Sequence, residues 1–400
     1  MPKTITSRDI DTQSEKTFFS KRNTIIIIVA FLLSISLIVV TLLYILDIKW
    51  NILFSQLSNG LSHQLGWLWF TLLFLFIPWT FFCRTITITI KLKQMGCHIS
   101  FWDKLMYTTT VSFLSAVTPA NFISDPYTIF WLKTHGISTS KASALTTCNA
   151  LLWEVAQLLI TMPSLIWIIC QWNDIFGSQA IDPSGGLIVF ILMIIGMIID
   201  FMGLTVMLIT GFSRKLHYLL SRIFNRIKQF LRMSYHTKEQ TYQTYVVHAK
   251  FQREFLLILK LWNTSIITLL IVGINEFYLY VTIFLALQYM AGLDSSYFKL
   301  DFVKIFNIAN VTTTANRFVP LPGGELSIEW IMKEFMFTKI GGITPQVTKD
   351  PNDSTASLIN NSIMVWRCWS SYFPATIGIF GFGSLTFTQI KRYKLKRNKK

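Results

Sequence analysis

The sequence predicts an all-α polytopic membrane protein with about six spanning helices and two re-entrant helical hairpins. Hydrophobic residues make up 52% of the 400-residue chain and charged residues only 14%, whereas soluble domains average about 25% charged residues. Several apolar runs approach or exceed the roughly 20 residues that cross a bilayer as a helix. Two further stretches pair shorter apolar pieces around a proline-containing break, and these predict the hairpins.

Six apolar runs account for the predicted spans. They are residues 24–46, 65–90, 142–170, 186–210, 255–290 and 357–385. The first run is too long for a signal-peptide core, and no small-residue cleavage site follows it, so we expect it to remain as a helix. We expect residues 47–64 to form a loop and residues 255–290 to form a single tilted or kinked helix.

The first hairpin is predicted at residues 105–132. Its two apolar pieces, 105–117 and 122–132, are parted by a short stretch that contains Pro119. At 1.5 Å per residue, neither piece crosses about 30 Å of hydrocarbon. We therefore expect the pair to enter and leave on one side of the membrane, with a second break at Asp125 and the proline after it.

The second hairpin is predicted at residues 302–337, where RFVPLPGGELSIE at 317–329 separates two apolar pieces. Pro322 lacks an N–H and clashes with the preceding turn, so it cannot continue a helix. Gly323 and Gly324 add backbone freedom that no other residue has. Irregular backbone at membrane depth is tolerated only where protein or water surrounds it, so this stretch is predicted to line a cavity.

Lysine and arginine residues predict the orientation. Segments 1–22, 84–104, 133–141, 211–253 and 391–400 hold 27 of the 36. The positive-inside rule places all five in the cytoplasm, with both termini inside; we expect the membrane to be a bacterial plasma membrane. Topology thus accounts for the net charge of +16, and we expect no nucleic-acid partner. The basic loop at 211–254 is expected to rest on anionic lipid, in part as an amphipathic helix.

This orientation reveals an inverted repeat. Residues 65–170 form a span, a hairpin and a span, and residues 255–385 repeat the order with opposite topology. Inverted repeats with helices broken at the midplane are typical of transporters that bind substrate at the breaks. Both repeats belong to one transmembrane domain at 24–390, between a cytoplasmic tail at 1–23 and a basic cytoplasmic tail at 391–400.

Several motifs resemble one family. VPLPGGELSIE at 319–329 is similar to the P-x-PGG-x-G-x-x-E motif of the lysylphosphatidylglycerol synthase/flippase transmembrane family, the membrane part of the bacterial multiple peptide resistance factor and its stand-alone relatives. TPANFISDPYTIFWLKTHGIS at 118–138 and the segment from Trp366-Arg367 to Pro374 resemble two further motifs of that family. The resemblance covers most of residues 65–385.

Three departures from the family pattern leave the substrate open. Ile123-Ser124-Asp125 replaces the Gly-Gly-Glu that is usual before the proline, and Glu325 stands where a hydrophobic residue or glycine is usual. Glu154 matches a glutamate of the family, but the arginine that follows it in the family is Val155 here. The chain also ends soon after its last span, without the soluble aminoacyl-transferase domain of the full-length factor. The resemblance therefore implies a flippase module without a synthase.

The predicted function is binding or moving a phospholipid, either anionic or aminoacylated as in lysylphosphatidylglycerol. One alternative is a phosphatidylglycerol lysyltransferase with a role in resistance to antimicrobial peptides and antibiotics, although the chain shows no nucleophile–base pair. Another is a transporter of small anions. We expect no cofactor or metal, because neither the five cysteines nor the six histidines cluster. Assembly as a homodimer stays open.

Candidate substrate-binding residues are the ionisable groups inside spans and the residues at the breaks, because a charge in lipid is costly. Arg367 would bind a phosphate and Glu154 a cationic headgroup; alternatively, these two residues pair with each other or with the backbone and are structural. Glu325 and Glu329 either face the cavity or cap a helix. The full set is Pro119, Asp125, Glu154, Arg317, Pro322, Gly323, Gly324, Glu325, Glu329 and Arg367; Asp200 and Glu276 are expected to be structural.

Overall fold

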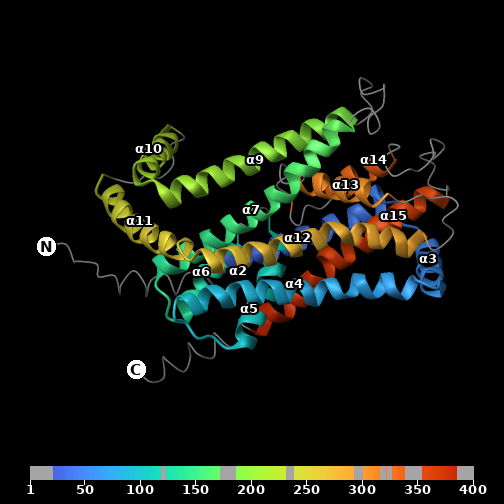
Figure 1. Cartoon of the computed structure of the whole chain (residues 1–400), viewed down its shortest axis with the longest axis horizontal. Coiled ribbons are helices and arrows are strands. Elements are labelled where there is room, and N and C mark those ends of the chain that lie inside the picture. The colour runs from blue at the N-terminus through green and yellow to red at the C-terminus, as the bar shows by residue number, and fades with distance from the viewer. Residues whose placement is uncertain are drawn as a thin grey trace.

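The computed structural model describes residues 21–118, 123–171, 186–230, 238–291, 301–315, 321, 327–337 and 354–384. Every regular element in these ranges is a helix, so the predicted all-α class is confirmed (Figure 1). The elements are α2 (Lys21–Val40), the π-helical turn η1 (Thr41–Ile45), α3 (Trp50–Ser62), α4 (Gly66–Gln94), α5 (Phe101–Val117), α6 (Ser124–Thr134), α7 (Thr139–Cys170), α9 (Gly186–Phe212), α10 (Arg214–Phe230), α11 (Lys238–Leu259), α12 (Trp262–Ala291), α13 (Phe302–Ala315), α14 (Ser327–Phe337), α15 (Ser354–Arg367) and the π-helical turn η5 (Cys368–Tyr372).

Five helical segments among these residues are long and apolar enough to cross a membrane. They are Ile25–Ile45, Gly66–Gln94, Thr139–Cys170, Ile194–Phe212 and Trp262–Ala291. The chain is therefore an all-α polytopic membrane protein. The sixth predicted span corresponds to α15, η5 and residues 373–384, which follow one another without a non-helical residue. Its crossing of the membrane stays a prediction.

Helices α4 and α12 form the axis of the molecule, where they run side by side over much of their length (Figure 1). The Thr80 hydroxyl donates to Asn275 Oδ1 at 3.1 Å, and the Phe76 ring meets the edge of Tyr278 at 5.3 Å between centroids. Hydrogen bonds between spanning helices contribute about 0.6–2 kcal/mol each. This pairing joins the first helix of each predicted repeat.

The two predicted hairpins lie at opposite ends of this axis. Hairpin 1 (α5 and α6) and hairpin 2 (α13 and α14) each pack their two short helices against one another, and Figure 1 places them at opposite ends of the long axis. An inverted repeat predicts this arrangement. The predicted residues at the breaks lie outside the described part of the chain: Pro119, Arg317, Pro322, Gly323, Gly324 and Glu325.

Glycine turns bound hairpin 1 at both ends. Gly96 and Gly136 follow α4 and α6 with φ of 68° and 85°, a left-handed conformation that favours glycine. The Ile137 amide donates back to the Leu132 carbonyl at 3.2 Å, which satisfies a carbonyl at the end of α6. At the start of α5, Ser100 Oγ accepts from the Asp103 amide at 3.1 Å.

The structure corrects three sequence-based expectations. Most of the predicted loop at 47–64 is helix α3, which packs against α4 and α12. The predicted single helix at 255–290 is interrupted at residues 260–261, so α11 and α12 are separate. Helix α4 continues to Gln94, four residues past the predicted end of its span, so Lys91 and Lys93 also belong to this helix.

The last helix contains a π-helical turn close to a proline. Pro374 has no N–H to donate to the carbonyl one turn earlier, and its ring crowds that carbonyl. The turn η5 at Cys368–Tyr372 ends two residues before Pro374. Such turns frequently occur at functional sites, and this one begins at the residue after Arg367.

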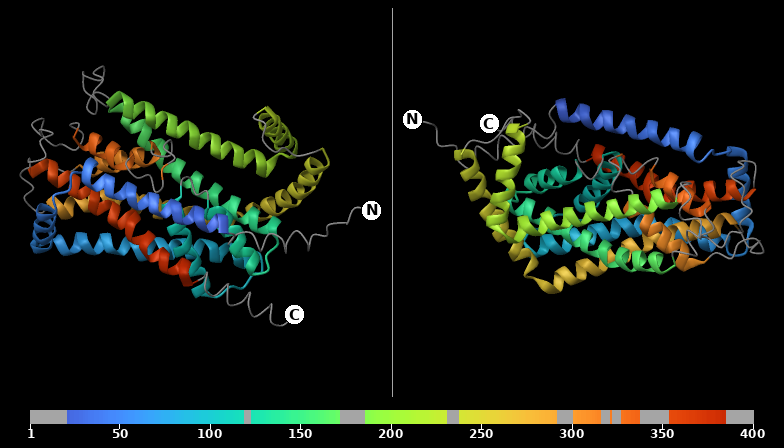
Figure 2. Two further views of the ribbon diagram at one scale, coloured as in Figure 1. Left: turned by 180° about the vertical axis from the view of Figure 1, so that it is seen from behind. Right: turned by 90° about the horizontal axis from the view of Figure 1, so that it is seen from above.

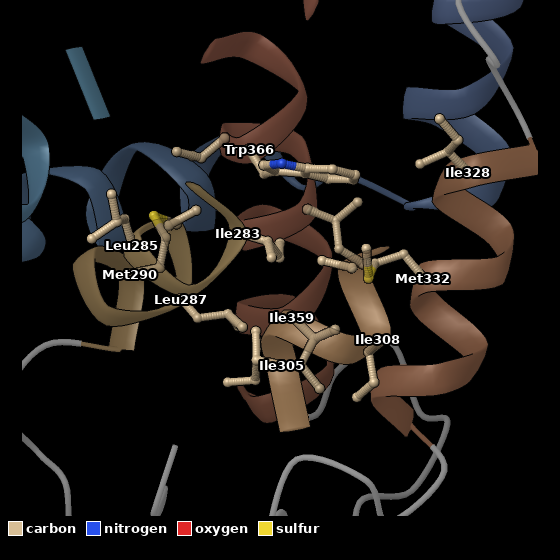
Figure 3. Packing of buried hydrophobic residues seen from close by; sticks show 14 of the residues in the cluster. Ile283, Leu285, Leu287, Met290, Ile305, Ile308, Ile328, Met332, Ile359 and Trp366 are labelled. Carbon is tan, nitrogen blue, oxygen red and sulfur yellow. The ribbon is translucent and has the colours of Figure 1, made fainter. Parts of the chain in front are cut away.

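A buried apolar core anchors hairpin 2. Figure 3 shows Ile283 and Leu287 of α12, Ile308 of α13, Met332 of α14 and Trp366 of α15 converging on one cluster. Trp366 is only 2% exposed. Burial of side chains of this size contributes about 1.5–3 kcal/mol each where water is the alternative. The core thereby fixes the residue that immediately precedes Arg367.

The described basic segments gather at one end of the molecule. Helices α10 and α11 lie at the same end as hairpin 1, whereas α3 and hairpin 2 lie at the other (Figures 1 and 2). Helix α10 carries basic residues and also exposes Leu216, Leu219 and Ile223. A helix of this type is suited to the interface between the membrane and water.

We expect Gly136→Ala to lower the free energy of unfolding by about 1–2 kcal/mol, because alanine in the left-handed region is strained. Gly273→Ala is the matched control. A Cβ at either glycine meets nothing within 4 Å, but only Gly136 has a positive φ. Denaturant unfolding of the purified protein in detergent measures both. Equal effects of the two substitutions would contradict the strain argument.

Candidate functional site

The described chain holds an ion pair between α14 and α15. Arg367 Nε lies 2.5 Å from Glu329 Oε1, and the two residues are 4% and 0% exposed. The guanidinium also lies 5.9 Å from the Trp366 ring centroid and 5.5 Å from that of Tyr372, distances at which cation–π attraction acts. Glu329 therefore neutralises Arg367 within the protein.

The local sequence explains the position of both partners. Glu329 occupies the first turn of α14, where the helix dipole favours an acidic side chain. Arg367 is the last residue of α15, directly before η5. The sequence analysis left open whether Glu329 caps a helix or faces a cavity. The structure places it at the helix start, with its carboxylate on Arg367.

Polar side chains also join α13 to α7. The Thr161 hydroxyl donates to Asn310 Oδ1 at 2.8 Å, and Asn310 Nδ2 donates to Ser164 Oγ at 3.0 Å. All three residues are buried. A buried amide that both donates and accepts is satisfied, so this contact fixes hairpin 2 against the longest helix of the first repeat.

A second charged site lies on α4. Thr80, Arg84 and Lys91 are spaced by four and seven residues, which places them on one face of a helix. We call this face the α4 stripe. Its residues contact three other helices: Thr80 reaches Asn275 of α12, Arg84 reaches α5 and α7, and Lys91 reaches α7.

Arg84 has neutral direct partners. Its Nη1 donates to Ser112 Oγ of α5 at 3.1 Å, and its guanidinium lies 5.3 Å from the Trp153 ring centroid of α7. Glu276 of α12 lies within electrostatic range and is 7% exposed. Within the described chain, no carboxylate oxygen lies within 4.0 Å of a nitrogen of Arg84, the distance that defines an ion pair.

Lys91 is more deeply buried than Arg84. It is 2% exposed, and its Nζ donates to Asn149 Oδ1 of α7 at 3.2 Å. Here too, the residues that the structure describes supply no carboxylate at ion-pair distance. The α4 stripe therefore holds two cations whose direct partners are a hydroxyl, an amide and an aromatic ring.

An open apolar groove lies beside the contact between α7 and α9. One cavity of about 470 Å³ is lined mainly by α7 and reaches α9. Its lining residues are Val155, Leu158, Leu159, Met162, Pro163, Ile166, Phe201 and Leu204. A second hollow of about 450 Å³ is lined by α9 alone, from Ile198 to Val206. We call the first cavity the α7–α9 groove.

The structure brings only some of the predicted residues together. It pairs Glu329 with Arg367, whereas Asp125 is exposed in the first turn of α6, in the hairpin at the other end of the axis. Glu154 is half-buried near the middle of α7, one turn from Leu158 of the groove. No group of three or more metal-ligating residues forms among the described residues.

The sequence analysis missed Arg84 and Lys91 as site residues. Both were counted only as charges that set the topology, although Arg84 lies within the predicted span 65–90 and Lys91 directly follows it. Their helical spacing with Thr80 was the available signal, because polar residues on one face of a spanning helix indicate an interior face.

Comparison with known proteins supports a membrane family. Residues 27–346 match the family model described as the lysylphosphatidylglycerol synthase TM region. The chain is 25% identical to the uncharacterized protein MG306 homolog of Mycoplasma pneumoniae over 375 residues, which cover 92% of this chain and 90% of the relative. It is 23% identical to the uncharacterized protein MG306 of Mycoplasma genitalium over 286 residues, 71% of this chain and 69% of the relative. No solved structure matches.

We expect Glu329→Gln to lower the free energy of unfolding by about 3–5 kcal/mol, because it leaves the buried Arg367 charge without its counter-ion. The double variant Glu329→Gln with Arg367→Gln removes both charges and should regain part of this loss. A double-mutant cycle on the purified protein measures the coupling. Strictly additive single effects would show that the pair contributes little.

Proposed function

Because the chain belongs to the lysylphosphatidylglycerol synthase transmembrane family, we propose that it binds a phospholipid and moves it between the two leaflets. A phospholipid has two chemically different parts, and each needs its own environment during such a movement. Apolar surface must accept the acyl chains. Charged and polar side chains inside the bundle must replace water around the headgroup.

The observation that carries the proposal is the α7–α9 groove. Its residues are apolar, and it lies between two helices that are long enough to span the membrane. An apolar groove fits an acyl chain, because the chain has no hydrogen-bonding group that would need a polar partner in the lining. It does not fit a small hydrophilic anion, because the lining offers almost no polar partner.

The charged groups supply the second environment. In the proposal, Glu154 on α7 contacts the cationic end of an aminoacylated headgroup. The pair of Glu329 and Arg367 would support hairpin 2, and Asp125 would stand at the start of α6 in hairpin 1. The remaining predicted residues, at the two breaks, would line the path between the hairpins.

Reconstitution into liposomes tests this function. Fluorescent phosphatidylglycerol and lysylphosphatidylglycerol are placed in both leaflets, and a membrane-impermeant quencher reports how fast the inner pool reaches the outer leaflet. We expect the protein to accelerate this transfer. Leu158→Trp fills the groove and should slow transfer by about tenfold, the effect of a misfit in an apolar pocket.

Leu270→Trp is the matched control for this test. Leu270 is 59% exposed on α12 and does not line the α7–α9 groove, so its enlargement should leave the rate unchanged. If neither lipid moves faster than in protein-free liposomes, the proposal fails. Uptake of small anions then becomes the function to measure.

We also propose that the end with hairpin 1, α10 and α11 faces the cytoplasm, since the described basic segments gather there. In a chain whose five cysteines are replaced by serine, Lys93→Cys and Asn59→Cys place single thiols at opposite ends. Both positions are exposed. A membrane-impermeant thiol reagent added to intact cells should label only the cysteine at 59; labelling only at 93 would reverse the orientation.

A further inference from the structure

The two arginines inside the bundle differ in how their charges are balanced. Arg367 meets the Glu329 carboxylate at 2.5 Å. Arg84 meets a serine hydroxyl at 3.1 Å and a tryptophan ring at 5.3 Å. A charge in the hydrocarbon region is costly unless something compensates it. The imbalance therefore singles out Arg84, and not Arg367, as the position where an anion would be stabilised.

The hydrogen bonds of Arg84 lead to the same conclusion. Its Nε is buried and has no hydrogen-bond partner in the described structure, although buried polar atoms are satisfied in the great majority of cases. Ser112 holds one terminal nitrogen, and the Trp153 ring lies against the guanidinium. These contacts orient the group and leave a donor without an acceptor.

Lys91 extends the positive charge along the α4 stripe. It lies seven residues after Arg84, about 10 Å further along the helix, toward the basic end of α4. With Glu276 as the carboxylate in electrostatic range of Arg84, the stripe holds two cations near one anion. Its charge is therefore positive within a predominantly apolar bundle.

We propose that the α4 stripe binds a phosphate-type oxyanion, with Arg84 as its principal ligand and Lys91 as the cation that it meets first from the basic end. The planar guanidinium fits two oxygens of a phosphate, and the lysine adds a point charge on the approach. The phosphate is either the phosphodiester of a lipid or free inorganic phosphate. This inference deepens the proposed function and rests on it for the lipid, but its test measures binding alone, which does not require movement between leaflets.

The test uses the full chain, purified in detergent and stripped of phospholipid. Three probes are titrated separately: dioleoylphosphatidylglycerol, dioleoylglycerol with the same chains but no phosphate, and inorganic phosphate. Each apparent affinity follows from the rise of the thermal unfolding midpoint with ligand concentration. For the wild type we expect the phospholipid to bind at least tenfold more tightly than dioleoylglycerol.

Arg84→Gln removes the charge and should weaken phospholipid binding by about tenfold or more, since hydrogen bonds to charged groups are the strong ones. Arg84→Lys keeps the positive charge but lacks the planar set of N–H donors, so it should give an intermediate loss of phospholipid affinity. This variant keeps the test informative if the glutamine variant does not fold. Lys93→Gln, at an exposed position on the same helix, should bind like the wild type.

The probes distinguish the sources of the phosphate. Stabilisation by the phospholipid alone supports a lipid headgroup site, and stabilisation by inorganic phosphate as well supports a site for either source. If dioleoylglycerol binds as tightly as the phospholipid, or if both Arg84 variants bind it like the wild type, the proposal is overturned. Absence of lipid movement in liposomes would refute the proposed function and leave this binding result unaffected.

Discussion

A charge inside a membrane needs a partner, and the described part of this bundle meets that requirement in two ways. Between α14 and α15, Glu329 neutralises Arg367, and this ion pair connects hairpin 2 to the last helix. On α4, Arg84 is held by Ser112 and Trp153, which orient the guanidinium without neutralising it. The first arrangement suits a structural support, and the second suits a site that awaits an anion.

Helix α7 connects these features, because different faces of it meet different parts of the molecule. Trp153 lies against Arg84 of α4, Thr161 bonds to Asn310 of α13, and Leu158 lines the groove toward α9. A shift of α7 would therefore change the surroundings of Arg84, hairpin 2 and the groove together. Such coupling through one rigid helix is what a transporter needs if the access of lipid and the exposure of charge are to change in step.

Composition and local patterns predicted most of the fold. Apolar run lengths placed five of the six predicted spans, because run length depends on residues adjacent in sequence. The proline and glycine residues that predict the two hairpin breaks lie outside the described residues. The pairing of Glu329 with Arg367 was not predictable, since it depends on how hairpin 2 packs on α15. Arg84 and Lys91 were assigned to a basic segment because a count of charges ignores helical face. Helix α3 was missed because its short run mixes apolar and polar residues.

The central claim is that a phospholipid headgroup enters the charged interior while its chains stay on apolar surface. Photo-crosslinking in native membranes tests it most directly, with phosphatidylglycerol that carries the reactive group either in the headgroup or at a chain end. The account predicts that the headgroup probe labels peptides around Arg84 and that the chain probe labels residues 155–166 and 198–206. Headgroup labelling confined to α10 and other surface segments, with none inside the bundle, would contradict it.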